Sequence, residues 1–259
     1  MTPAELLGSA GGMAFTCLVA FAAGLAHGLS GFGFPLISTP TMALVSEVRT
    51  AVLVTLIPNI GVNIVSAASG LGWRENLRRH WAMPMWVLVG TIVGTQVVIW
   101  APVNVLRLLL AGMIVVYLRQ DRFKRVDWSV VNRHPGRAGA AFGLLGGFLS
   151  GTVNVMLPPL LIYFTTLAVP PLAMTQVMNA CFLVGKVSQA AVFALHGRVT
   201  LDGLAWTLPV CLVGYGGYVA GRRLQSRVSP AAYRRMIRAV LWFMAALLVA
   251  QAAGVVGRR

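Results

Sequence analysis

The most constraining feature of this chain is a series of apolar runs that are long enough to cross a lipid bilayer. Two of them, residues 81–100 and 236–256, are almost entirely apolar over their whole length, and a membrane-spanning helix needs about 20 such residues. Only 10% of the residues are charged, whereas soluble domains carry about 25%. The sequence therefore predicts an all-α, polytopic membrane protein.

The first apolar run, residues 13–29, is expected to belong to the fold. It follows Glu5 instead of a basic region, and no convincing cleavage site comes after it. Both features argue against a signal peptide that is removed.

The charged residues indicate orientation in a membrane. The chain has 21 Lys and Arg against six Asp and Glu, a net charge of +15, which often indicates nucleic-acid binding. Most of the Arg residues in this set lie in short loops between apolar runs, and such a distribution is typical of cytoplasmic loops. We therefore expect a lipid bilayer around the chain and no nucleic-acid partner. Cys17, Cys181 and Cys211 lie inside apolar segments without metal-ligand spacing, so no disulfide, metal or other cofactor is expected.

The chain divides into two halves, residues 1–119 and 138–259, joined by a basic linker at residues 120–137 that we expect to be cytoplasmic. The self-comparison aligns Ser30 with Ser150 and Asn59 with Asn179, both 120 positions apart. Each half holds five apolar segments. These are residues 13–29, 33–46, 49–70, 81–100 and 103–119, then 138–150, 153–168, 173–196, 201–221 and 231–256.

A glycine-containing break separates the first two segments of each half. Residues 28–35 read G-L-S-G-F-G-F-P, and residues 147–154 read G-F-L-S-G-T-V-N. The flanking segments are too short for full spans, so they predict a re-entrant hairpin or a tilted, broken pair of helices. Helices broken at equivalent places in two repeats indicate a transport site.

Loop charges predict that the two halves have opposite orientations. The loop at residues 74–79 is basic, while its equivalent at residues 198–202 is nearly neutral. Conversely, the turn at Pro102 is neutral and its equivalent at residues 222–227 is basic. Equivalent loops that exchange sides are what an inverted-topology repeat requires.

Ionisable residues inside the apolar segments favour an anion as the substrate. All six Asp and Glu residues lie at the ends of the apolar segments or in loops, and none lies in a segment's interior, which argues against a cation site or a carboxylate proton relay. Lys186 lies well inside segment 173–196. A cation at that depth is costly unless it meets an anion, a carbonyl group or water. The alternative is a lysine that snorkels to the interface.

Polar residues at helical spacing accompany this lysine. Asn179 precedes Lys186 by seven positions, with Gln176 and Gln189 beside them, and the equivalent helix carries Thr55, Asn59, Asn63 and Ser66. Two such stripes facing each other would line a cavity at the centre of the membrane. The alternative is that these amides hold helices together.

The breaks predict further donors for an anion. Free backbone N–H groups are expected at residues 31–34 and 152–155, where the second helix of each pair would begin with a positive dipole end. Gly31, Gly33 and Gly151 would let an anion approach the backbone, or would only permit tight packing. The side chains of Ser30, Ser150, Thr152 and Asn154 are additional candidate ligands.

His27, just before the first break, is a candidate for proton exchange at neutral pH or a structural hydrogen-bond donor. The residues show no catalytic constellation, since a Ser/His/Asp set would lack a buried Asp. We therefore expect a protein that is not an enzyme.

The chain resembles the TauE/SafE family of membrane permeases in three features. These are the glycine-rich first break, the second such break after the basic linker, and the spacing of Asn179 and Lys186 before His196–Val199. The resemblance covers nearly the whole chain. It implies a multi-pass transporter of the bacterial inner membrane that moves sulfite, sulfonates or related organic anions, coupled to the proton gradient. The breaks here are bulkier than the family's usual glycine run, reading G-F-G-F-P and T-V-N-V, which leaves the choice of anion open.

These observations predict a secondary transporter with its anion site between the two breaks. The expected ligands are Ser30, Gly31, Gly33, Asn59, Asn63, Ser150, Gly151, Thr152, Asn154, Asn179, Lys186 and Gln189, with His27 as the candidate for proton coupling. A passive anion channel and a non-transporting membrane subunit are the alternatives. A homodimer is an open possibility at this stage.

Overall fold

The computed structural model describes residues 3–123, 126–198 and 201–254, and in these residues all regular structure is helical. The first half contains α1 (Pro3–Gly8), α2 (Ala10–Ser30), α3 (Phe34–Val45), α4 (Val48–Ala67), α5 (Trp73–Arg79), α6 (Ala82–Trp100) and α7 (Val103–Leu118). The linker region contains α8 (Gln120–Phe123) and α9 (Ser129–Arg133). The second half contains α10 (Pro135–Val153), α11 (Leu157–Thr166), α12 (Pro171–Leu195), α13 (Leu201–Leu224) and α14 (Pro230–Ala252).

The ten predicted segments correspond to helices, but the expected lengths of the opening segments are wrong. α2 has 21 residues and α10 has 19, so only α3 and α11, with 12 and 10 residues, are short. α10 extends N-terminally through Arg137 and Pro135, where hydropathy gives no signal. α2, α4, α6, α12 and residues 235–252 of α14 are each long and apolar enough to span a membrane.

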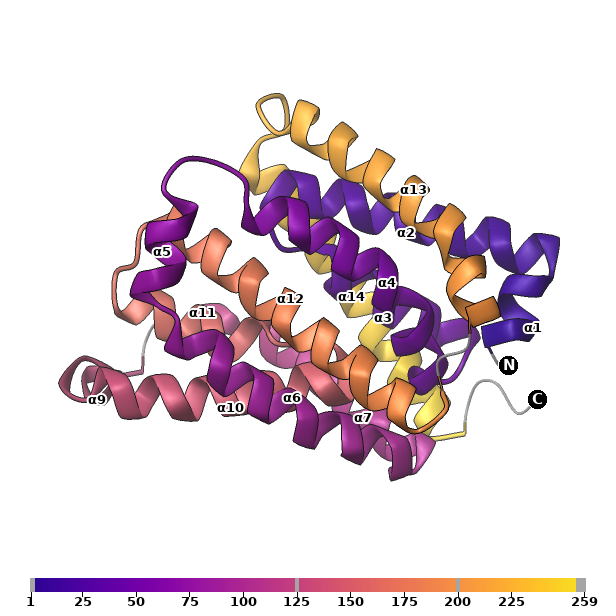
Figure 1. The fold of residues 1–259 in the computed structure, drawn as a ribbon, viewed down its shortest axis with the longest axis horizontal. Coiled ribbons are helices and arrows are strands. Elements are labelled where there is room, and N and C mark those ends of the chain that lie inside the picture. The colour runs from indigo at the N-terminus through magenta and orange to yellow at the C-terminus, as the bar shows by residue number, and fades with distance from the viewer. Residues whose placement is uncertain (1–2, 124–125, 199–200, 255–259) are drawn as a thin grey trace.

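The two halves interlock. α2 packs along α13, and α10 packs along α6, so the opening helix of each half lies against a long helix of the other half (Figure 1). α4 and α12 pack against each other between these pairs, and α7 packs on α14. In Figure 1, α2 runs from right to left and α10 from left to right. The pairing of contacts is reciprocal, as a two-fold relation between the halves requires.

Glycines allow these helix pairs to approach closely. A Cβ atom added to Gly24 of α2 would lie 2.0 Å from the carbonyl oxygen of Gly214 in α13. A Cβ atom added to Gly147 of α10 would lie 2.2 Å from the carbonyl oxygen of Val87 in α6. Any larger residue would push the helices apart, so small residues at these positions determine the packing.

The same contacts give the equivalence between the halves. Gly24 and Gly147 differ by 123 positions, and α3 and α11 begin at residues 34 and 157, again 123 apart. α4 and α12 begin at residues 48 and 171, with the same offset. The predicted alignment at 120 is therefore wrong by three residues, nearly one helical turn. Lys186 is equivalent to Asn63, and Ser150 is equivalent to His27.

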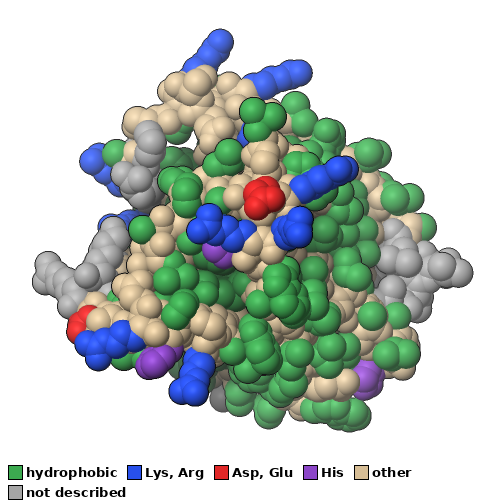
Figure 2. All heavy atoms as spheres, turned by 60° about the vertical axis from the view of Figure 1, so that its left-hand side comes forward, with side chains coloured by type: hydrophobic (Ala, Val, Ile, Leu, Met, Phe, Trp, Pro, Cys, Tyr) green, Lys and Arg blue, Asp and Glu red, His purple; other side chains and the backbone are tan. Residues whose placement is uncertain are grey.

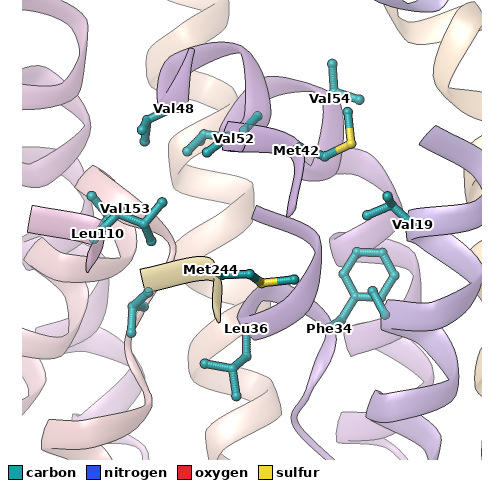
Figure 3. Close-up of a cluster of buried hydrophobic side chains, with 14 of the residues drawn as sticks. Val19, Phe34, Leu36, Met42, Val48, Val52, Val54, Leu110, Val153 and Met244 are labelled. Atoms are coloured by element: carbon teal, nitrogen blue, oxygen red, sulfur yellow. The ribbon is translucent and has the colours of Figure 1, made fainter. Parts of the chain in front are cut away.

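The apolar core surrounds the short helix α3. Phe34 and Met42 are fully buried, and Figure 3 shows them among side chains from α2 and α4, with Leu36 of α3 near Met244 of α14. Apolar contacts therefore hold α3 in place from several sides. This packing fixes the position of the break that precedes it.

Candidate functional site

The first break lies at Gly31–Gly33, as predicted. Gly31 ends α2 in the left-handed conformation, with φ of 84°, and its N–H donates to the carbonyl oxygen of His27 over 2.7 Å. α3 begins at Phe34, with Pro35 in its first turn. Glycine suits this conformation because it has no Cβ atom to clash, and proline suits a position whose N–H has no partner in the helix.

The second break lies later than predicted, at Asn154–Met156. Ser150, Gly151 and Thr152 are within α10, and Asn154 ends the helix in the left-handed conformation with φ of 61°. A glycine permits a break but does not require one. Here Gly151 packs inside the helix, where an added Cβ atom would lie 2.5 Å from the Thr91 oxygen of α6.

The expectation of free backbone donors at the breaks is wrong at several positions. The N–H of Phe34 donates to Nδ1 of His27 over 3.4 Å, and the N–H of Phe32 approaches the Ser30 hydroxyl at 3.5 Å. Asn154 N–H donates to the Ser150 oxygen over 3.2 Å, and Val155 N–H to the Leu149 oxygen over 3.4 Å. At the two breaks, a ligand would therefore meet side-chain groups more than free main-chain N–H groups.

Lys186 is the centre of a buried polar cluster. It is the sixteenth of the 25 residues of α12 and its side chain is 0% exposed. Its Nζ atom donates to Oδ1 of Asn154 and, over 2.5 Å, to Oε1 of Gln189. The alternative of a lysine snorkelling to the interface is therefore wrong. Lys186 meets the second break directly.

The two amides are themselves oriented by further bonds. Nε2 of Gln189 donates to the carbonyl oxygen of Gly151 over 2.8 Å, and Nδ2 of Asn154 donates to Oγ1 of Thr39 over 2.9 Å. Both amide oxygens consequently point at the lysine. Thr39 lies on the short helix α3 of the first half and is not among the ligands predicted from the sequence. No feature of the sequence around Thr39 indicates that α3 contacts the second break.

In the described part of the chain, the hydrogen-bond partners of Lys186 carry no negative charge. Two neutral oxygens compensate only part of the cost of burying an ammonium group in a low-dielectric interior. The cluster as it stands is thus electrostatically suited to an added anion.

His27 and Asn179 meet at the first break. Nδ2 of Asn179 donates to the carbonyl oxygens of Gly31 and Thr175, both over 2.7 Å. Nε2 of His27 lies 2.8 Å from Oγ of Ser66 on α4. With Nδ1 accepting from Phe34, both ring nitrogens of His27 have partners, which fits a neutral ring that donates from Nε2. These residues hold α2, α3, α4 and α12 together at the break.

Asn59 and Asn63 form a pair on α4. Nδ2 of Asn63 donates to the main-chain oxygen of Asn59 over 2.7 Å and to its Oδ1. Both side chains are 0% exposed, and Nδ2 of Asn59 and Oδ1 of Asn63 have no partner. Oγ of Ser150 and Oδ1 of Asn179 are also buried without a partner. Unpaired buried polar atoms are costly, so they fit a ligand or water that completes them.

The structure brings only some predicted ligands together. Lys186, Asn154, Gln189 and Gly151 form one cluster, and Ser150 is close to it because a Cβ atom on Gly185 would lie 3.6 Å from its hydroxyl. The hydroxyls of Ser30 and Thr152 bond to carbonyls of their own helices, Ala26 and Phe148. Gly33 precedes α3 as its N-cap.

A separate cavity of about 550 Å³ opens between the linker and α11. None of the predicted ligands lines it. Its walls include Gln120, Asp127, Trp128, Asn132, Pro158, Leu161 and Thr165. Among the described residues, no three His, Cys, Asp or Glu side chains gather where they would hold a metal ion.

The comparisons with known proteins give one match. Residues 16–248 match the family model described as sulfite exporter TauE/SafE. The matched range contains both breaks, Lys186 and the linker. No curated protein and no solved structure matches the chain.

Proposed function

Because the chain belongs to the TauE/SafE sulfite exporter family, a family of membrane transporters, we propose that it is a secondary transporter of a small sulfur-containing or organic anion. Sulfite and short sulfonates such as sulfoacetate are the proposed substrates. The anion binds beside Lys186, Asn154 and Gln189, in the bacterial inner membrane, with transport coupled to the proton gradient.

One observation carries this proposal: a lysine that is 0% exposed inside a long apolar helix and has only amide oxygens as partners. An ammonium group in such surroundings is stabilised by an anion far more than an exposed one is, because solvent screens the charge so little there. A bound oxyanion would accept from Nζ of Lys186, either in place of the amide oxygens of Asn154 and Gln189 or together with them. The amide N–H groups could then orient the anion.

Orphaned donors support an oxyanion as the ligand. Nδ2 of Asn59 and the hydroxyl of Ser150 are buried and unpaired, and both can donate to oxygen. Ser150 lies beside Gly185, one position before Lys186. An anion with several oxygens, such as pyramidal sulfite or a tetrahedral sulfonate, can accept from Lys186 and from the Ser150 hydroxyl together.

The distribution of charge supports an orientation. The basic helix α5 and the linker helix α9 lie at the left of Figure 1, and the basic end of α13 lies at its upper left. Figure 2 turns the left-hand side forward and shows Lys and Arg side chains at its top, in its centre and at its lower left, among hydrophobic side chains. Under the positive-inside rule this end faces the cytoplasm. The two halves then cross the membrane in opposite directions, as inverted repeats do.

Burial favours a transporter over a passive channel. Lys186, Gln189 and Asn154 are no more than 1% exposed, so an anion reaches them only if packed helices separate. That is the behaviour of alternating access around a central site. A homodimer has no support from the contacts of this chain, and a non-transporting subunit is tested by the experiment below.

The test is sulfite binding and flux by the purified protein. Sulfite should raise the Tm of the wild type, since a ligand of the folded state stabilises it, and reconstituted protein should move radiolabelled sulfite across liposomes. Lys186→Met should abolish both effects. Val187→Met is the matched control, because Val187 is exposed at the adjacent position. A Lys186→Met variant with wild-type flux overturns the proposal, and a wild type without flux favours a non-transporting subunit.

A further inference from the structure

We infer that Lys186 is itself the proton carrier of the transport cycle: its ammonium form accompanies the bound anion, and its neutral amine form returns without one. This inference rests on the proposed function, because it assigns the coupling step to the same site. It replaces His27 as the coupling group.

The surroundings of Lys186 are electrically neutral. Asn154 and Gln189 accept from Nζ through Oδ1 and Oε1, and neither carries charge. A neutral amine has two N–H groups and can keep both contacts. An anion beside Nζ stabilises the ammonium form, whereas the empty site gives that charge no negative partner.

The helices that pack against α12 place few other titratable groups near Lys186. α6 contains no titratable residue, and α3, reached through Thr39, contains none either. α5 meets α12 near Gln176, ten positions before Lys186. The remaining groups on packed elements are Arg49 in the first turn of α4, Arg137 at the start of α10, Tyr163 of α11 and the Cys181 thiol of α12.

The two arginines and Tyr163 are engaged or remote, and the Tyr163 hydroxyl donates to the carbonyl oxygen of Pro135 over 3.2 Å. Arg49 donates to the carbonyl oxygens of Val98 and Ala101 at the end of α6, over 2.9 Å in each case. Arg137 lies 14 positions before Gly151 on α10, about 21 Å along the helix. The carboxylate on these elements is Glu75 of α5, which is exposed, whereas Lys186 is fully buried. The transported anion is therefore the negative partner that the protonated lysine requires.

Both ring nitrogens of His27 already have hydrogen-bond partners. Nδ1 accepts from Phe34 N–H, and Nε2 lies 2.8 Å from the Ser66 hydroxyl. A second proton on the ring would have to break the Phe34 contact, which holds the start of α3. The geometry makes His27 a structural residue of the first break.

In the proposed cycle, each anion crosses the membrane with one proton. On the side to which the site is open, Nζ takes a proton from the aqueous phase (from hydronium) as the anion enters, and the occluded site then holds an ammonium–anion pair. On the other side, the anion leaves, the N–H bond breaks, and the proton enters water. One proton and one anion move together, and the empty carrier returns with a neutral lysine.

The decisive variant is Lys186→Arg, because guanidinium stays protonated. In proteoliposomes, wild-type protein should accumulate radiolabelled sulfite when a pH gradient is imposed, and should also exchange external for internal sulfite. In Lys186→Arg the ratio of gradient-driven net flux to exchange should fall at least about tenfold relative to the wild type, since the charged empty carrier cannot return. Lys186→Met should lose both. Gradient-driven accumulation by Lys186→Arg at the wild-type rate overturns the inference.

A binding measurement keeps the inference testable if the arginine variant fails to fold. Wild-type protein that binds sulfite should take up protons, approaching about one per bound anion, as pH rises into the range where the empty site holds a neutral amine. Calorimetric titration in buffers of different ionisation enthalpy measures this number. Sulfite binding without any proton uptake over the whole pH range contradicts the inference but leaves the anion site intact, whereas absent binding contradicts the proposed function.

Discussion

The Nζ atom of Lys186 donates to the side-chain oxygen of Asn154, the residue that ends α10 in a left-handed conformation. The one buried lysine of the described chain is therefore tied to the break in the second half. Because Asn154 also donates to Thr39 of the first half, a change of charge at the lysine acts on the helix end and on a half-helix of the opposite half. The proposed anion site and the second break therefore share one set of hydrogen bonds.

Replacing Asn154 with Asp should give Lys186 a permanent carboxylate partner. Asp tolerates the left-handed conformation as Asn does, so the helix end should be retained. The internal carboxylate competes with a bound anion, and sulfite affinity should fall at least about tenfold, or about 1.4 kcal/mol. The size of the sulfite-induced rise in Tm measures this. Asn154→Gly, which keeps the backbone conformation without adding charge, is the control, and equal affinity in wild type and Asn154→Asp would contradict the prediction.

Gly217→Ala should lower stability sharply. A Cβ atom there would lie 2.2 Å from the carbonyl oxygen of Phe21, so α2 and α13 must separate. Overpacking of this kind costs about 1–3 kcal/mol. Gly216→Ala is the matched control, because an added Cβ atom at Gly216 meets nothing within 4 Å and alanine favours helix by up to about 1 kcal/mol. Thermal unfolding in detergent compares them, and equal Tm values would show that this seam is not tightly packed.

Gln176→Met should destabilise the loop between α4 and α5. Nε2 of Gln176 donates to the Ser69 carbonyl oxygen over 2.8 Å, and its Oε1 accepts from Asn76 over 2.7 Å. Losing both should cost about 1–3 kcal/mol for each group left unpaired. Gln176→Glu, which keeps the acceptor for Asn76, should have an intermediate Tm. A rise in Tm with sulfite as large as in the wild type is expected for both variants, and its loss would place Gln176 in the binding site.

His27→Gln should lower the Tm because the start of α3 loses a hydrogen-bond acceptor and Ser66 loses its partner. A double-mutant cycle with Ser66→Ala should give a coupling energy of about 0.5–3 kcal/mol. Sulfite flux that remains in His27→Gln should still respond to an imposed pH gradient. Flux that no longer responds to the gradient would return the coupling role to His27.

The sequence by itself determined the fold class, the segments and the presence of a buried cation. These properties follow from local chemistry: an apolar run of sufficient length forms a spanning helix, and Gly31 followed by Pro35 ends one helix and starts another. Lys186 in the middle of α12 is recognisable because no other residue of that segment carries a full charge.

Only the tertiary structure decided where the second break lies and which residues face the lysine. Gly151 is equally compatible with a break and with a close helix contact, and its contact with Thr91 of α6 keeps it inside α10. That contact moves the break to Asn154 and makes Asn63, not Ser66, the equivalent of Lys186. The partners Asn154 and Thr39 come from distant parts of the chain. Hydrogen bonds between such residues depend on how the helices pack, which local sequence does not encode.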